Sequence, residues 1–195
     1  YTGAFDNGIF MSELEFSYKY DENGKVVDIS CKTVSEKKFI WYGTGGNDPE
    51  GPHLYKINGW YYLLISEGGT EFCHMITVAR SRNIWGEYES CPRNPVFSNR
   101  STSLPIKGTG HMDIVCDQYG DWWGVCLANR PITYPFKHNL GRETFLVPVE
   151  WDDKDWPVIG RNGLLDERIS SDRKLHEGVM QKSQTDEGKH FHDEF

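Results

Sequence analysis

Two aromatic hairpin motifs that recur 61 residues apart constrain the fold of this chain more than any other feature of its sequence. Residues 53–62 and 114–123 each contain an apolar run, a turn with a glycine and a second run rich in tyrosine or tryptophan. The same offset aligns Tyr61 with Trp122. Repeated aromatic hairpins are typical of β-propeller blades, which are four-stranded sheets arranged around a central axis. Two unrelated hairpins of a β-sandwich are the alternative interpretation.

Turn signals divide residues 9–165 into short strands. The Asn-Gly pairs at 23–24 and 58–59 each separate two apolar runs, which is a strong hairpin signal because such a turn requires positive φ angles. Gly120 and residues 152–155 separate two further pairs of runs. No window longer than ten residues keeps the 3.6-residue apolar period of a helix. The chain is therefore predicted to be all-β throughout this range.

The composition supports strands and excludes some partners. Aromatic residues make up 14% of the chain, and 20 of the 195 residues are glycine, which favours strands and tight turns over helices. With 21 Lys and Arg against 29 Asp and Glu, the net charge is −8. We therefore expect no nucleic-acid partner and no anionic membrane surface as a partner. The longest apolar run, residues 60–65, is far shorter than the ~20 residues of a membrane helix.

Five cysteines, an odd number, cannot pair completely within the chain. No two of them have the Cys-x-x-Cys spacing of a zinc knuckle or a redox site. Cys116 and Cys126 lie within apolar strand-like runs, where a reduced cysteine behaves as a small apolar residue. We therefore predict free, buried thiols in preference to a disulfide framework.

The C-terminal residues 166–195 differ from the rest of the chain. They contain eight acidic and five basic residues and few apolar ones, a composition typical of a solvated segment. The sequence therefore predicts a β-rich domain over residues 1–165, followed by a polar linker or tail.

The 61-residue offset also aligns Glu50 with His111. Each of these residues precedes the first strand of its repeat. In a propeller, equivalent positions at the start of the innermost strands converge on the central axis, so side chains far apart in the sequence can share one pocket. We therefore expect Glu50 and His111 to meet in a central pocket contributed by adjacent blades.

Several motifs, in their order along the chain, resemble those of glycoside hydrolase family 43, in particular its β-xylosidases and α-L-arabinofuranosidases. For the third blade they are PEGPHLY at 49–55, EGGT at 67–70 and TVARS at 77–81; for the fourth, GTGHMD at 108–113; for the fifth, NLGRETF at 139–145 and PVEW at 148–151. The resemblance implies a five-bladed β-propeller of which this chain holds about three blades, from the end of blade two to blade five. Residues 1–165 would then be part of the catalytic domain.

The resemblance also implies an inverting glycosidase, which needs two carboxyl groups roughly 6.5–9.5 Å apart, one as general acid and one as the base that activates water. Glu50 matches the family's general acid. His111 matches the central histidine that in some members touches a metal-bound water or supports the acid, and Arg142 matches the arginine that contacts sugar hydroxyls and the carboxylates, so both are expected to bind the substrate. The alternatives are a solvated loop carboxylate at Glu50, a packed histidine at His111, and an ion pair of Arg142 with Glu143 or Glu150. Tryptophans of the repeats could stack on sugar rings, although core positions are more common for them.

By this resemblance the substrate is a xylo- or arabino-oligosaccharide, from which terminal xylosyl or arabinosyl units are released. No cofactor is required, no metal ligands can be assigned from spacing, and a structural Ca²⁺ at the propeller centre is compatible with the family. The base and the aspartate that tunes the acid are expected upstream of Tyr1, so the chain alone is expected to be inactive. The alternatives are a non-catalytic carbohydrate-binding or degenerate propeller, and an unrelated β-sandwich interaction domain.

Overall fold

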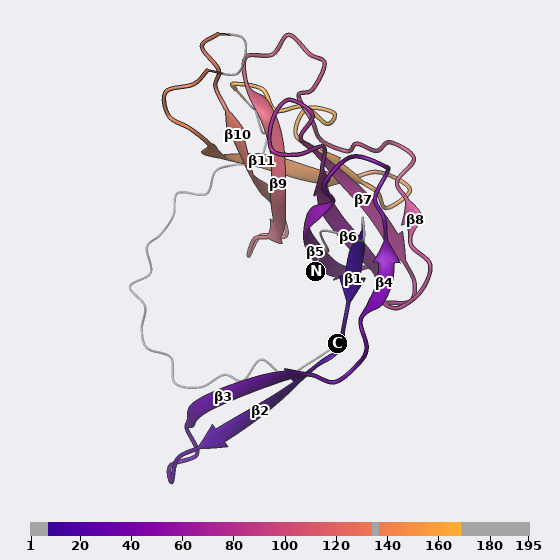
Figure 1. Cartoon of the computed structure of the whole chain (residues 1–195), viewed down its shortest axis with the longest axis vertical. Coiled ribbons are helices and arrows are strands. Elements are labelled where there is room, and N and C mark those ends of the chain that lie inside the picture. The colour runs from indigo at the N-terminus through magenta and orange to yellow at the C-terminus, as the bar shows by residue number, and fades with distance from the viewer. Residues whose placement is uncertain (1–7, 134–136, 169–195) are drawn as a thin grey trace.

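The structure, a computed structural model, describes residues 8–133 and 137–168. Within these residues all regular structure is β, and the strands form small antiparallel sheets (Figure 1). In chain order the strands are β1 (Ile9–Met11), β2 (Leu14–Tyr20), β3 (Val26–Thr33), β4 (Lys38–Trp41), β5 (Glu50–Ile57), β6 (Trp60–Glu67), β7 (Met75–Ser81), β8 (Glu89–Ser90), β9 (Lys107–Cys116), β10 (Trp122–Asn129), β11 (Glu143–Trp151) and β12 (Pro157–Ile159). The all-β prediction is confirmed.

Two four-stranded meanders form the body of the described chain. One has the strand order β5-β6-β7-β8 and the other β9-β10-β11-β12, with sequential strands as neighbours in both. The predicted hairpins at the two aromatic motifs are the β5–β6 and β9–β10 pairs. At the first of these turns Asn58 and Gly59 have φ angles of +51° and +74°, as the Asn-Gly signal requires. The repeat therefore marks two successive blade-like sheets.

The segment that was expected to begin a fifth blade, residues 139–151, belongs instead to the second of these sheets. Its strand β11 pairs with β10 from Trp122↔Val149 to Ala128↔Glu143, and β12 pairs with the other edge of β11. The prediction was wrong because a long connection, residues 130–142, precedes β11. Such a connection carries no hairpin signal that would identify the pairing partner of the next strand.

Strands β6 and β7 are buried on both faces. Tyr62 and Leu64 of β6 pack into the main core, which also contains Met112 and Val147 of the second sheet and Phe97. A second cluster lies on the opposite face, where side chains of the first sheet meet those of the small β1–β4 sheet. Its members are Ile9, Trp41, Leu63, Ile65 and Ala79. The first four-stranded sheet is therefore covered on one face by the second, and on the other by strands that precede it in the chain.

The β2–β3 hairpin extends away from this body (Figure 1). One of its faces carries the ion pairs Lys19–Asp28, at 2.8 Å, and Lys32–Glu15, at 2.6 Å. The opposite face carries apolar side chains that are about half exposed: Leu14, Phe16, Tyr18, Tyr20 and Ile29. The hairpin itself was predicted from its Asn-Gly turn.

Arg80, on β7, links the two four-stranded sheets. Its guanidinium carbon lies 4.1 Å from the centre of the Trp60 ring and 3.9 Å from that of Trp156. Its Nε donates to Glu89 Oε1, and one Nη donates to the carbonyl oxygen of Lys154, both at 2.6 Å. Since Trp156 and Lys154 precede β12, one buried guanidinium ties the edge of the second sheet to the first.

We expect Arg80→Lys to lower the free energy of unfolding of the complete protein by about 2 kcal/mol, because an ammonium group cannot both stack between two indole rings and donate in two fixed directions. Urea denaturation measures this loss. Arg82 is the matched control, because it also stacks on Trp60, at 3.6 Å, but is exposed. Arg82→Lys should lower the free energy of unfolding by less than about 1 kcal/mol. Equal losses in the two variants would contradict a linking role for Arg80.

All five cysteines are free in the structure, and the prediction that they are buried is only partly right. Cys91 and Cys126 are buried, and burial raises the pKa of the Cys126 thiol to about 12. Cys116, predicted to be buried, is exposed, as are Cys31 and Cys73. Cys116 is the last residue of β9, where the strand reaches the solvent-facing turn. Within the described ranges there is no helix long and apolar enough to cross a membrane.

Candidate active site

Glu50 and His111 meet where the first strands of the two four-stranded sheets approach each other. Glu50 is the first residue of β5, and His111 lies within β9. Glu50 Oε1 is 3.4 Å from His111 Nδ1, and the two side chains are partly exposed, at 34% and 44%. The structure therefore brings together the two residues that the 61-residue offset aligns.

The backbone of β5 and β6 fixes this arrangement. The β5–β6 register shifts between Glu50 and His53, and Gly51 within this bulge has a φ of +54°. A Cβ at Gly51 would lie 3.2 Å from the His111 ring, so glycine permits both the positive φ and the close approach. The His111 N–H donates to Ser66 Oγ at 2.8 Å, and Ser66 is the register partner of Glu50. The position of His111 is thus set by the sheet that carries Glu50.

A buried carboxylate that sequence analysis did not identify, Glu67, shapes the glycine-rich loop before β5. Glu67 is fully buried at the end of β6. Its Oε1 accepts hydrogen bonds from the N–H groups of Thr44 and Gly46, both at 2.9 Å, and its Oε2 accepts one from the Thr77 hydroxyl at 2.5 Å. A Cβ at Gly43 would lie 2.5 Å from Glu67 Oε1. The glycines therefore let the loop wrap around this carboxylate.

His74 is a second site residue that sequence analysis missed. It is 1% exposed, its Nδ1 is 3.1 Å from the Gly108 carbonyl oxygen, and its Nε2 has no hydrogen-bond partner among the described residues. One ligand atom each from His74, Glu50 and His111 lies within 4.8 Å of the other two. Burial, more than any other cause, lowers the pKa of His74. Because His74 follows an irregular segment, neither the repeat nor strand alternation could have identified it.

Nearby charges also affect the pKa of His74. The Glu50 carboxylate opposes the lowering, whereas the charges of His111 and Arg142 add to it. Arg142 is exposed just before β11. Its suggested alternative partner, Glu143, instead pairs with Arg130, whose Nε donates to Glu143 Oε2 at 2.9 Å.

Asp113, the nearest acid after His111 in the chain, has a structural role. Its Oδ1 accepts a hydrogen bond from the Tyr55 hydroxyl at 2.5 Å, and the Ile114 N–H donates to the Tyr55 oxygen at 3.0 Å. His53 Nδ1 lies 3.5 Å from the same Asp113 oxygen. Burial and the hydrogen bond to Asp113 raise the pKa of Tyr55. This cluster joins β5 to β9 beside the Glu50–His111 pair.

With the site defined, the chain can be compared with known proteins. Residues 4–157 match the profile of Glycosyl hydrolases family 43. The chain belongs to this family. The family 43 fold is a five-bladed β-propeller, and solved family members superpose on most of the chain. The two four-stranded sheets and the strands before them are therefore part of such a propeller, as the sequence predicted.

Among family 43 relatives, the non-reducing end alpha-L-arabinofuranosidase BoGH43B of Bacteroides ovatus is 48% identical over 147 residues, which are 75% of this chain and 26% of the relative. A beta-xylosidase of Bacillus subtilis is 38% identical over 151 residues, which cover 71% of this chain and 28% of the relative. The crystal structure of a xylan beta-1,4-xylosidase from Bacillus halodurans superposes with a TM-score of 0.69 at 32% identity. The match covers 87% of this chain and 37% of that protein. The chain thus spans about a quarter of the length of the two curated relatives.

The Ca²⁺ compatible with family 43 does not match the side chains at this site. Ca²⁺ binds about six to eight oxygen ligands. The side chains of Glu50, His74 and His111 offer one carboxylate and two ring nitrogens. This set does not fit a Ca²⁺ ion.

The tryptophans of the repeats have packing roles rather than positions beside Glu50. Trp60 stacks with Arg80, as described above. Trp122 makes an edge contact with Trp151, with ring centres 5.7 Å apart. The Trp123 indole N–H donates to Asp117 Oδ2 at 3.1 Å. The expectation that these rings are structural agrees with the contacts.

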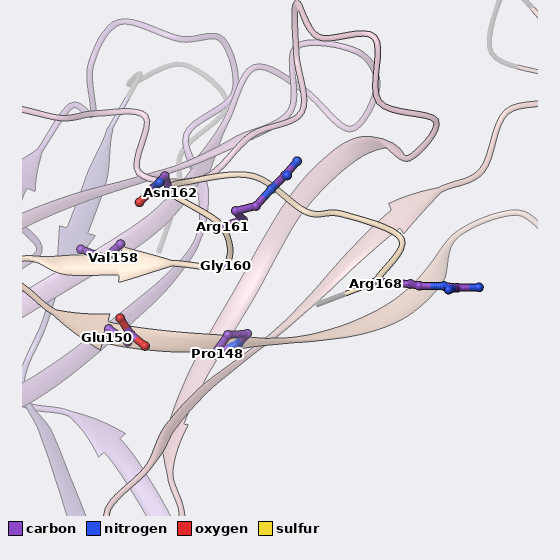
Figure 2. Close-up of a pocket in the computed structure, with 7 residues that line it drawn as sticks. All are labelled: Pro148, Glu150, Val158, Gly160, Arg161, Asn162 and Arg168. Atoms are coloured by element: carbon purple, nitrogen blue, oxygen red, sulfur yellow. The ribbon is translucent and has the colours of Figure 1, made fainter. Parts of the chain in front are cut away.

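A separate hollow on the second sheet shares no lining residue with the Glu50 site. It is lined by Pro148, Glu150, Val158, Gly160, Arg161, Asn162 and Arg168 (Figure 2). Arg161 in this hollow pairs with Asp166 at 2.8 Å. Glu150, the other suggested partner for Arg142, is exposed and lies here.

Proposed function

We propose that the protein containing this chain is an inverting glycosidase that releases terminal xylosyl or arabinosyl units from oligosaccharides or plant-cell-wall polysaccharides, with Glu50 as the general acid. The observation that carries the proposal is the Glu50 carboxylate beside His111, at the head of β5 where two propeller sheets converge. The activities for which the relatives are named, those of an arabinofuranosidase and of xylosidases, support the substrate class.

The proposed reaction assigns a role to each side chain. Protonated Glu50 gives its proton to the glycosidic oxygen as the bond to the anomeric carbon breaks. A second carboxylate removes a proton from the water that attacks the opposite face of the sugar. His111 and Arg142 bind sugar hydroxyls, and the planar guanidinium of Arg142 can donate two parallel hydrogen bonds. No cofactor takes part in these steps.

The base is proposed to lie outside this chain. The carboxylate of Asp113 is already bound by the Tyr55 hydroxyl, which makes it a poor activator of water. The curated relatives are about four times longer than the part this chain matches. On this proposal the 195-residue chain alone hydrolyses no xyloside, and the complete protein does.

The stereochemistry of the first product tests the proposed mechanism. We expect the complete protein to release α-xylose from an aryl β-xyloside, or β-arabinose from an aryl α-L-arabinofuranoside, before mutarotation. Proton NMR during the first minutes of the reaction distinguishes the two anomers. Release of the anomer with retained configuration would overturn the inverting mechanism. Sugar binding without hydrolysis would favour the alternative of a carbohydrate-binding propeller.

A further inference from the structure

The β2–β3 hairpin has one apolar face and one charged face. Residues that lie directly opposite each other in an antiparallel pair point to the same side of the sheet. One side, which we call the apolar face, is formed by the pairs Leu14↔Thr33, Phe16↔Cys31, Tyr18↔Ile29 and Tyr20↔Val26. The pairs that alternate with them, Glu15↔Lys32, Ser17↔Ser30 and Lys19↔Asp28, form the other side.

The described part of the chain leaves the apolar face in water. Its six large apolar side chains, Leu14, Phe16, Tyr18, Tyr20, Val26 and Ile29, are 39% to 61% exposed. Neither core cluster of the described residues includes a member of β2 or β3, and the hairpin extends away from the body (Figure 1). An isolated two-stranded hairpin is at best marginally stable in water. The hairpin therefore needs a second layer against its apolar face.

The area of the apolar face is sufficient for a specific interface. A free aromatic side chain presents roughly 150–250 Å², so a half-exposed ring leaves about 100 Å² in water and an aliphatic side chain somewhat less. The six side chains together expose roughly 500 Å². Two such faces packed together would bury roughly 1,000 Å², which is about the lower limit for a specific protein interface.

The chemistry of the apolar face suits a protein surface better than a sugar chain. A sugar site needs polar groups beside its aromatic rings to bind the hydroxyls. The apolar face contains no charged and no amide side chain, and Val26, Ile29 and Cys31 make its β3 half aliphatic or weakly polar. A charged ligand would likewise find no partner there. We therefore looked for an apolar partner of matching shape, and the hairpin itself provides one.

We propose that the apolar faces of two copies of the complete protein pack against each other as a two-layered β-sandwich. The bulky rings of Phe16, Tyr18 and Tyr20 are all on β2, whereas the side chains opposite them on β3 are smaller. A two-fold axis that runs along the strands, between the layers, places β2 of each copy over β3 of the other. Large side chains then lie over small ones, as close packing requires.

The charged side of each hairpin remains in water in this dimer. The ion pairs Lys19–Asp28 and Lys32–Glu15 lie there, so that no charge of these pairs is buried by the association. No residue of the hairpin belongs to the Glu50 site, and the dimer is therefore independent of the role proposed for Glu50.

Analytical ultracentrifugation of the complete protein tests the dimer. We expect the wild type to form a dimer whose fraction rises with concentration. Tyr18→Asp should lower the association constant at least about 100-fold, because the two-fold axis buries the new carboxylate twice. Ile29→Asp should do the same from the other strand. The matched control is Ser17→Asp, which adds the same charge one residue away on the charged face and should leave the association constant unchanged.

The reactivity of Cys31 gives a second readout. Cys31 is exposed on the apolar face, so the dimer should protect its thiol from alkylation. Mass spectrometry should show slow modification of Cys31 in the wild type and at least about tenfold faster modification in Tyr18→Asp, because the apolar face is then uncovered. Cys116, which lies outside the hairpin, should react at the same rate in both proteins.

Several results would overturn the proposal. A wild type that is monomeric at all concentrations does so whatever the variants show. If Cys31 is nevertheless protected in that monomer, another part of the complete protein covers the apolar face. If the monomer is retained on insoluble xylan and Tyr18→Asp is not, the face binds a polysaccharide. A wild-type dimer that persists unchanged in Tyr18→Asp and Ile29→Asp would place the interface elsewhere.

Discussion

Replacing Glu50 with glutamine in the complete protein is expected to lower kcat on xylobiose or an arabino-oligosaccharide about 10²- to 10⁴-fold. Glutamine keeps the size and hydrogen-bonding capacity of the side chain but has no proton to transfer. The sugar leaving group is a poor one, so bond cleavage depends on its protonation. Substrate binding should change much less, because His111 and Arg142 remain.

The dependence on the leaving group separates an acid from a residue that only shapes the site. For a dinitrophenyl xyloside, whose leaving group departs without protonation, Glu50→Gln should retain most of the wild-type rate. A structural defect would lower the rates on both substrates to the same extent. Steady-state kinetics on the two substrates make this comparison.

Glu150 provides the matched control. It is an exposed glutamate that lines the hollow of Figure 2 and lies away from His111. Glu150→Gln should leave both rates within about twofold of wild type, because surface substitutions away from special features have small effects. Equal rates for Glu50→Gln and the wild type on the disaccharide would refute the assignment of the acid.

The hairpins could be read from the sequence because their signals are local. An Asn-Gly turn marks the chain reversal in both the β2–β3 and the β5–β6 pairs. At β5–β6 the two positive φ angles also fix the register beside the turn, whereas the β2–β3 register shifts near its turn. The partner of β11 could not be read in this way, since residues 130–142 separate it from β10. Burial was also difficult to predict at the strand end, where Cys116 emerges into solvent.

At the site, the repeat predicted the meeting of Glu50 and His111 because equivalent positions of adjacent blades share the same place relative to the axis. His74 and Glu67 escaped prediction for a different reason. Their importance comes from burial and from partners distant in sequence, such as the Gly108 carbonyl for His74. A single sequence contains no signal for a buried polar contact between a strand and a loop that are distant in the chain.

Glu67 is the position where a substitution should most reduce stability. We expect Glu67→Ala to lower the free energy of unfolding by about 3–5 kcal/mol, because it leaves the N–H groups of Thr44 and Gly46 and the Thr77 hydroxyl without their acceptor and opens a cavity. Urea denaturation of the complete protein measures this loss.

Glu67→Ala should also lower the rate of hydrolysis, because the loop held by Glu67 leads directly into β5 and Glu50. In a Glu67→Ala variant that still folds, we expect weakened hydrolysis together with the lower stability. The exposed Glu87, in the connection between β7 and β8, is the control, and Glu87→Ala should change the free energy of unfolding by no more than about 0.5 kcal/mol. If Glu67→Ala were as mild as Glu87→Ala, the loop would be held by its glycines and neighbours alone, and the buried carboxylate would not be its anchor.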